Sequence, residues 1–87
     1  MLETVKLALR WRTGAFDTEL QTYIDSCKND LMFGGMNKEK WKESDNTIVS
    51  VVVAYCKWFT NYQGQGDRWE KIYKSLKTSL VLNKEYH

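Results

Sequence analysis

The sequence predicts an all-α fold, a small four-helix domain that spans residues 1–87. The chain contains no proline, and its five glycines are clustered rather than scattered, which favours helices joined by short breaks. Its 43% hydrophobic and 14% aromatic content is typical of a packed globular protein, and 87 residues provide for one core. The third observation is the helical periodicity of the longest apolar run.

That run covers residues 48–62, and its valines alone would favour a strand. Small or polar side chains recur within it, however, in one narrow stripe at about 100° per residue: Ser50, Ala54, Lys57 and Asn61. On a strand the same positions would divide between two faces. We therefore predict a central apolar helix over about residues 46–62, covered by the rest of the chain. It is too short and too interrupted by polar residues to span a bilayer.

The chain begins with a short predicted helix over residues 2–9, which Gly14 is expected to stop. Trp11 follows this helix between two arginines. Such a tryptophan can stack on a nucleic-acid base, but we favour packing at the helix junction, with the arginines in solvent.

The second helix is predicted to begin at Asp17, which is a good N-cap residue, and Glu19 adds a negative charge to the first turn. One continuous apolar face follows at helical spacing: Phe16, Leu20, Tyr23, Ile24, Cys27 and Leu31.

The segment after this helix must be a loop, because two consecutive glycines end the helix. Its lysines do not have the spacing of a phosphate-binding loop. Phe33, Met36 and Trp41 are the apolar side chains of this segment. If exposed, they would be contact residues for another chain, and the alternative is that they fold back on the core. Asp45 or Asn46 then caps the central helix.

The last helix is predicted to begin at Asp67, with Glu70 at capping-box spacing, after a turn in which Gly64 or Gly66 is left-handed. Its apolar face consists of Trp69, Ile72, Tyr73, Leu76 and Leu80. Lys71 and Lys74 lie on the opposite face, where they would contact DNA phosphates or remain solvated.

The final segment, residues 81–87, carries Val81, Leu82 and Tyr86 and is apolar enough to dock on another surface. We interpret this C-terminal tail as an arm for a neighbouring subunit.

No catalytic or cofactor-binding constellation is found. His87 is the only histidine, so a histidine-based metal site or a Cys–His pair is not expected. Cys27 and Cys56 both fall on apolar helical faces, where reduced and buried thiols are expected, although the sequence leaves a disulfide open. We predict that the protein is not an enzyme.

The chain resembles the small head–tail connector (adaptor, or head-completion) proteins of long-tailed double-stranded DNA bacteriophages and prophages. The matching stretches are residues 5–10, 16–20, 24–31 and 67–80, followed by Tyr86. Their order and spacing, together with the overall length, carry the resemblance.

The resemblance implies a four-helix structural protein without chemistry, located at the head–tail junction of the virion and in the host cytoplasm during assembly. It further implies a ring of about a dozen copies below the portal protein, which extends the DNA channel and carries the stopper or tail-completion protein. A ring subunit needs two different patches that fit head to tail. We expect the Trp41 loop and the tail to contact a neighbouring subunit or the portal, and any contact with channel DNA to ignore its sequence.

The alternative is a small helical DNA-binding protein, such as a phage regulator or a small terminase-type subunit, with the last two helices as a helix-turn-helix. Against it, Trp69 and Ile72 occupy the first turns of the would-be recognition helix, where polar side chains should read base edges.

Overall fold

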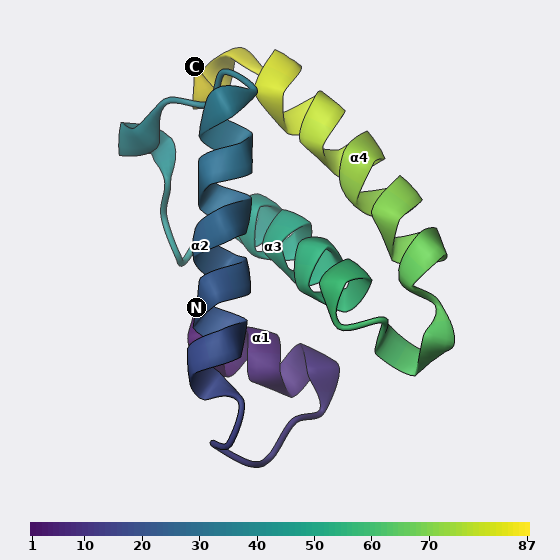
Figure 1. Ribbon diagram of the computed structural model, residues 1–87. Coiled ribbons are helices and arrows are strands. Elements are labelled where there is room, and N and C mark those ends of the chain that lie inside the picture. The colour runs from purple at the N-terminus through teal and green to yellow at the C-terminus, as the bar shows by residue number, and fades with distance from the viewer.

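The computed structural model describes residues 1–87, and its elements confirm the all-α prediction (Figure 1). The four α-helices are α1 (Leu2–Leu9), α2 (Asp17–Phe33), α3 (Asn46–Phe59) and α4 (Gly66–Leu82). Three single turns of 3₁₀-helix lie outside them, at Lys38–Lys40, Tyr62–Gly64 and Lys84–Tyr86. None of the helices combines the length and the apolar character that crossing a membrane would require.

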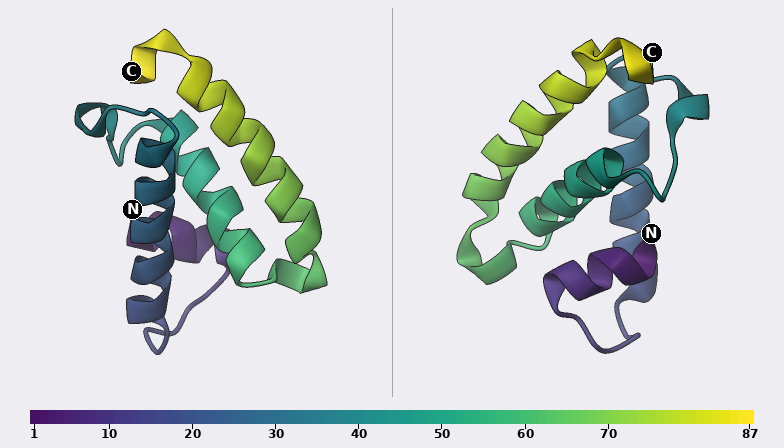
Figure 2. Two further views of the ribbon diagram at one scale, coloured as in Figure 1. Left: turned by 45° about the horizontal axis from the view of Figure 1, so that its top comes forward. Right: turned by 180° about the vertical axis from the view of Figure 1, so that it is seen from behind.

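Helix α3 is the centre of the fold, as predicted, because it packs against α1, α2 and α4. Figures 1 and 2 show it between the long helices α2 and α4, with α1 crossing the lower half of α2. Its core side chains are Ile48, Val51, Val52, Ala54, Tyr55 and Cys56. The helix ends at Phe59 rather than near residue 62, because Asn61 adopts a left-handed conformation (φ 50°). Ala54 belongs to the core, so only part of the predicted polar stripe faces solvent.

The predicted helix caps are correct in one case out of three. Asp45 caps α3, and its carboxylate accepts the backbone N–H of Thr47 at 2.8 Å. Asp17 and Asp67 do not cap, because α2 begins one residue earlier, and α4 two residues earlier, than a cap at these positions requires. Both aspartates instead lie in the first turn, where a negative charge is still favourable.

Asp17 has a second role, since it ties α2 to α1. Its carboxylate lies 2.9 Å from the Lys6 ammonium, which is almost completely covered. The hydrogen bond to Asp17 raises the pKa of Lys6 above its ordinary value, so the lysine stays charged.

The turn between α3 and α4 depends on Asn61 and Gly66. The Gly66 N–H donates to the Asn61 side chain at 2.8 Å, and a Cβ on Gly66 would lie 3.1 Å from the Trp58 carbonyl oxygen. Gly64 takes the left-handed conformation that was predicted for one of the two glycines. Beside this turn the Lys57 ammonium lies over the Tyr62 and Trp69 rings, 4.6 and 4.4 Å from their centroids.

The upper parts of α2 and α4 are joined through a polar network at the edge of the core. The Tyr73 hydroxyl donates to the Asp30 carboxylate at 2.5 Å, and the Lys77 ammonium lies 2.9 Å from the same oxygen. Tyr73 is itself only 2% exposed and packs edge-on against Tyr55, with the ring centroids 5.0 Å apart.

Cys27 and Cys56 are both buried and free, as expected. Burial raises the pKa of each thiol to about 12, so neither is a thiolate at neutral pH.

Candidate assembly surfaces

Helices α2 and α4 end side by side (Figures 1 and 2), and each ends in an apolar residue that is exposed to solvent. Phe33 is the last residue of α2 and is 92% exposed, and Leu82 is the last residue of α4 and is 72% exposed. The two ends touch, since a Cβ on Gly34 would lie 3.2 Å from a Val81 methyl group. We call this surface, made of Phe33, Val81 and Leu82, the Phe33 end. It contains three of the six residues for which the sequence predicts contacts with another subunit.

Met36 and Tyr86 are not exposed. Met36 folds back on the core, which is one of the two alternatives for the loop, and Tyr86 packs within the chain instead of extending from it as an arm. Met36 is 4% exposed and its N–H donates to the Leu31 carbonyl, which closes the end of α2. Tyr86 is 8% exposed; its hydroxyl donates to the Asp45 carboxylate at 2.9 Å, and its carbonyl accepts the Asn37 N–H at 2.8 Å. The tail and the loop therefore pack against each other, because each satisfies backbone and side-chain groups of the other.

Trp41 is half-buried and packs against the core. The Lys28 ammonium of α2 lies 5.4 Å from the centroid of its ring. This places Trp41 between the two predicted alternatives, because one part of the ring is covered by the chain itself and another part remains accessible.

Lys71 and Lys74 are exposed on α4, as predicted. Lys74 is engaged locally: its ammonium lies 2.6 Å from the Glu70 carboxylate, the i,i+4 partner. Lys71 is not part of any ion pair. One partly neutralised lysine and one free lysine form a weak basic face.

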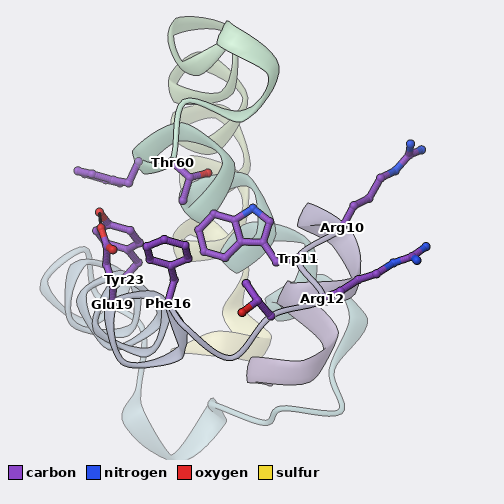
Figure 3. A pocket seen from close by; sticks show the side chains of 9 residues that line it. Arg10, Trp11, Arg12, Phe16, Glu19, Tyr23 and Thr60 are labelled. Atoms are coloured by element: carbon purple, nitrogen blue, oxygen red, sulfur yellow. Dashed lines mark hydrogen bonds between the residues drawn. The ribbon is translucent and has the colours of Figure 1, made fainter.

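A groove of about 590 Å³ lies at the other end of α2, between the α1–α2 loop and the end of α3 (Figure 3). We call it the aromatic groove. Its lining residues are Arg10, Trp11, Arg12, Thr13, Phe16, Glu19, Tyr23, Phe59 and Thr60.

Two pairs of aromatic rings form the wall of the groove, one tilted and one stacked. The Trp11 and Phe16 centroids are 5.8 Å apart, as are the centroids of Tyr23 and Phe59. The Tyr23 hydroxyl donates to the Glu19 carboxylate at 2.8 Å, and this hydrogen bond raises the pKa of Tyr23. Phe16 and Phe59 are both exposed, so the groove offers aromatic surface that no part of this chain covers.

Two arginines stand at the rim of the groove, and Figure 3 shows both side chains extending away from the rings, on the same side of Trp11. Neither forms an ion pair within the chain. Arg10 ends α1 in a left-handed conformation (φ 60°, ψ 33°), in place of the predicted stop at Gly14. A residue with a Cβ is strained in this conformation, which normally favours glycine.

Replacing Arg10 with glycine is therefore expected to stabilise the isolated chain, by about 0.5–1 kcal/mol after the greater flexibility of glycine in the unfolded chain is included. Urea denaturation followed by circular dichroism measures the change. Arg12→Gly is the matched control, because Arg12 has no positive φ. Equal effects of the two substitutions would contradict the strain argument.

The sequence did not point to this groove, because Phe16 and Tyr23 fit the apolar face of α2 and Phe59 continues the apolar run of α3. One feature of the sequence could have indicated the groove. The chain has more large apolar side chains at these element ends than one small core covers. For Trp11, packing at the helix junction is confirmed, since the indole is half-buried against the core.

The structure brings together no group of three or more His, Cys, Asp or Glu side chains that could hold a metal ion. Its distinctive surfaces are apolar and lie at element ends, which is the chemistry of protein–protein contact.

Neither the curated proteins nor the solved structures compared with the chain gave a significant match. A family model did: the model described as "Phage connector protein" matches residues 1–87. This match spans the whole sequence and agrees with the resemblance to head–tail connectors and with the all-helical fold. The chain therefore belongs to the phage connector protein family.

Proposed function

We propose that the protein is a ring-forming head–tail connector, which assembles below the portal protein, extends the DNA channel and joins the head to the stopper or tail-completion protein. Family membership makes it a structural component of the virion that associates with other head or tail proteins. The ring, its copy number of about twelve and the individual partners belong to the proposal. The observation that carries it is the family match over residues 1–87.

The distribution of apolar surface supports the ring. Phe33 and Leu82 at one end of α2, and Phe16 and Phe59 at the other, are exposed on a domain that already has a complete core. Two different exposed apolar surfaces at opposite ends favour head-to-tail association. Such an assembly closes into a ring when the rotations between neighbouring subunits add up to a full turn. A regulator that binds DNA as a two-fold dimer would instead need one self-complementary patch.

The polar surface supports a structural role in the same way. The net charge is +2, Lys74 pairs with Glu70, and Trp69 in the first turn of α4 is covered by Lys57. A recognition helix would present polar side chains at this position. Contact with channel DNA, through Lys71 and Lys74 or through the arginines at the groove, would be limited to phosphates.

Native mass spectrometry of the concentrated protein, with negative-stain images of the same sample, tests the proposal. We expect a closed ring of about twelve copies that dissociates slowly after dilution. We also expect only weak, salt-sensitive DNA binding. A stable dimer that takes up duplex DNA at physiological salt would contradict the proposal and support the regulator. A sample that remains monomeric should be titrated with the portal protein, because a ring that closes only on the portal then appears as a portal-bound assembly.

A further inference from the structure

The exposed large apolar side chains of this chain are not spread evenly. Four of the five lie at the two ends of α2: Phe33 and Leu82 at one end, Phe16 and Phe59 at the other. The fifth, Leu7, lies on α1 and lines a second hollow together with Arg10, Trp11 and Arg12. Since α2 has 17 residues, its ends are about 25 Å apart. The two surfaces therefore belong to opposite ends of a molecule whose longest dimension is 37 Å. Within one chain they cannot contact each other.

The two surfaces also differ in shape. The Phe33 end is convex, because Phe33 is the last residue of a helix and almost its whole side chain is in solvent. The aromatic groove is concave, and the rings of Trp11, Phe16 and Phe59 line it. A projecting aromatic ring and a groove lined with aromatic rings fit each other, since ring pairs gain from tilted and offset contacts beyond their buried area.

Their electrostatics differ in sign. The groove carries two unpaired guanidinium groups, Arg10 and Arg12, and lies at the positive, N-terminal end of α2. Its one carboxylate, Glu19, accepts the hydrogen bond of the Tyr23 hydroxyl. The Phe33 end collects the negative, C-terminal ends of both α2 and α4, and neither helix has a basic residue in its last turn. The Met36 N–H and the His87 ring already contact carbonyl groups at these ends. Arginine side chains of one copy would therefore add their charge to the negative helix ends of another, without filling empty acceptors.

We propose that the Phe33 end of one copy docks in the aromatic groove of the next copy, with Phe33 inserted among the rings and Arg10 and Arg12 against the ends of α2 and α4. This inference rests on the proposed ring and names its subunit interface. Each copy uses the Phe33 end toward one neighbour and the groove toward the other, so the contact is heterologous and repeats around the ring.

Two substitutions test the two sides of this interface independently. Phe33→Asp places a carboxylate on the inserted side chain; the position is exposed, so the fold is retained. Phe16→Asp removes a ring from the groove; Phe16 is the N-cap residue of α2, where aspartate is favoured, so the helix is retained. Ser75→Asp is the matched control, since it adds the same charge at an exposed position of α4 that belongs to neither surface.

Native mass spectrometry is run on each protein at a concentration at which the wild type is fully assembled. We expect Phe33→Asp and Phe16→Asp each to remain monomeric, and Ser75→Asp to assemble as the wild type does. Circular dichroism of every variant confirms that the helices are intact.

An equimolar mixture of Phe33→Asp and Phe16→Asp provides the decisive measurement. The first variant keeps an intact groove and the second an intact Phe33 end, so one good interface remains per pair. We expect a dimer containing one copy of each, which cannot grow further. A two-fold contact through Phe33 alone would give no such mixed dimer.

The outcomes distinguish this inference from the proposed function. If both variants assemble like the wild type, or if Phe33→Asp fails and Phe16→Asp still forms rings, the Phe33-to-groove contact is wrong while the ring stands. If both are monomeric and the mixture yields no mixed dimer, the two surfaces meet other partners and the inference is overturned. If the wild-type protein does not self-associate, either alone or with the portal protein, the result contradicts both the proposed ring and this interface.

Discussion

Tyr73→Ala is expected to remove a large part of the free energy of unfolding of this domain. Tyr73 is the largest fully buried side chain and lies where α4 crosses α3, against the rings of Tyr55 and Trp58. Truncation of a buried aromatic side chain to alanine costs about 3–5 kcal/mol, through lost apolar burial and the cavity that remains. A domain of 87 residues has a total stability of roughly 4–13 kcal/mol, so this loss is a large fraction of it.

Urea denaturation followed by circular dichroism measures the effect, and Tyr73→Phe is the control. Phenylalanine keeps the ring and removes only the hydroxyl that donates to Asp30. We expect this variant to lose about 1.5–3 kcal/mol, the contribution of one hydrogen bond to a charged group. If Tyr73→Phe were as unstable as Tyr73→Ala, the polar network rather than ring packing would dominate the contact between α2 and α4.

Asp30→Ala is expected to cost about 1–3 kcal/mol at neutral pH, because it leaves the buried Tyr73 hydroxyl without an acceptor. It also removes the partner of Lys77, although this half-exposed ion pair contributes less. Asp25→Ala on the exposed side of the same helix is the matched control, with an expected change within about 0.5 kcal/mol.

The same carboxylate makes the stability depend on pH. Partial burial opposes the ionisation of Asp30, but the hydrogen bonds from Tyr73 and Lys77 and the charge of Lys77 outweigh it and lower the pKa below the ordinary value. The unfolded chain therefore binds the proton more tightly than the native chain does. The stabilisation is complete above the unfolded pKa of about 3.9 and is lost as the pH falls through the lower native pKa.

Urea midpoints measured at intervals from neutral pH down to pH 2–3 check this sign. We expect the stability of the wild type to fall in the acid range, and the fall to be shallower in Asp30→Ala. The difference between the two proteins should accordingly shrink toward low pH. A difference that is constant over the whole range would show that Asp30 acts only through packing.

Much of the fold could be read from local patterns. The small and polar residues of the central run recur at helical spacing, and this predicts α3 against the strand preference of its valines. The apolar face of α2, the Asp45 cap and the Glu70–Lys74 pair depend on neighbours within one or two turns. Such features are set by sequence spacing alone, so they were predictable.

The errors concern residues whose role depends on distant partners. Asp17 was expected as a cap, but it pairs with Lys6 across a turn. Tyr86 was expected to contact another subunit, and Met36 either to do so or to fold back on the core. Both are covered, because the loop and the tail hydrogen-bond to each other, 49 residues apart at Asn37 and Tyr86. No periodicity within a single segment reports a contact of this kind.

The sequence by itself determined four helices, their order and the central place of α3, because helical periodicity, capping and glycine breaks act over a few residues. Only the tertiary structure decided which apolar residues remained outside the core. Phe16, Phe33 and Phe59 look alike in sequence, and each is exposed because the helices beside it end or diverge there. Exposure follows from how much surface the rest of the chain can cover, and that quantity exists only once the helices have packed.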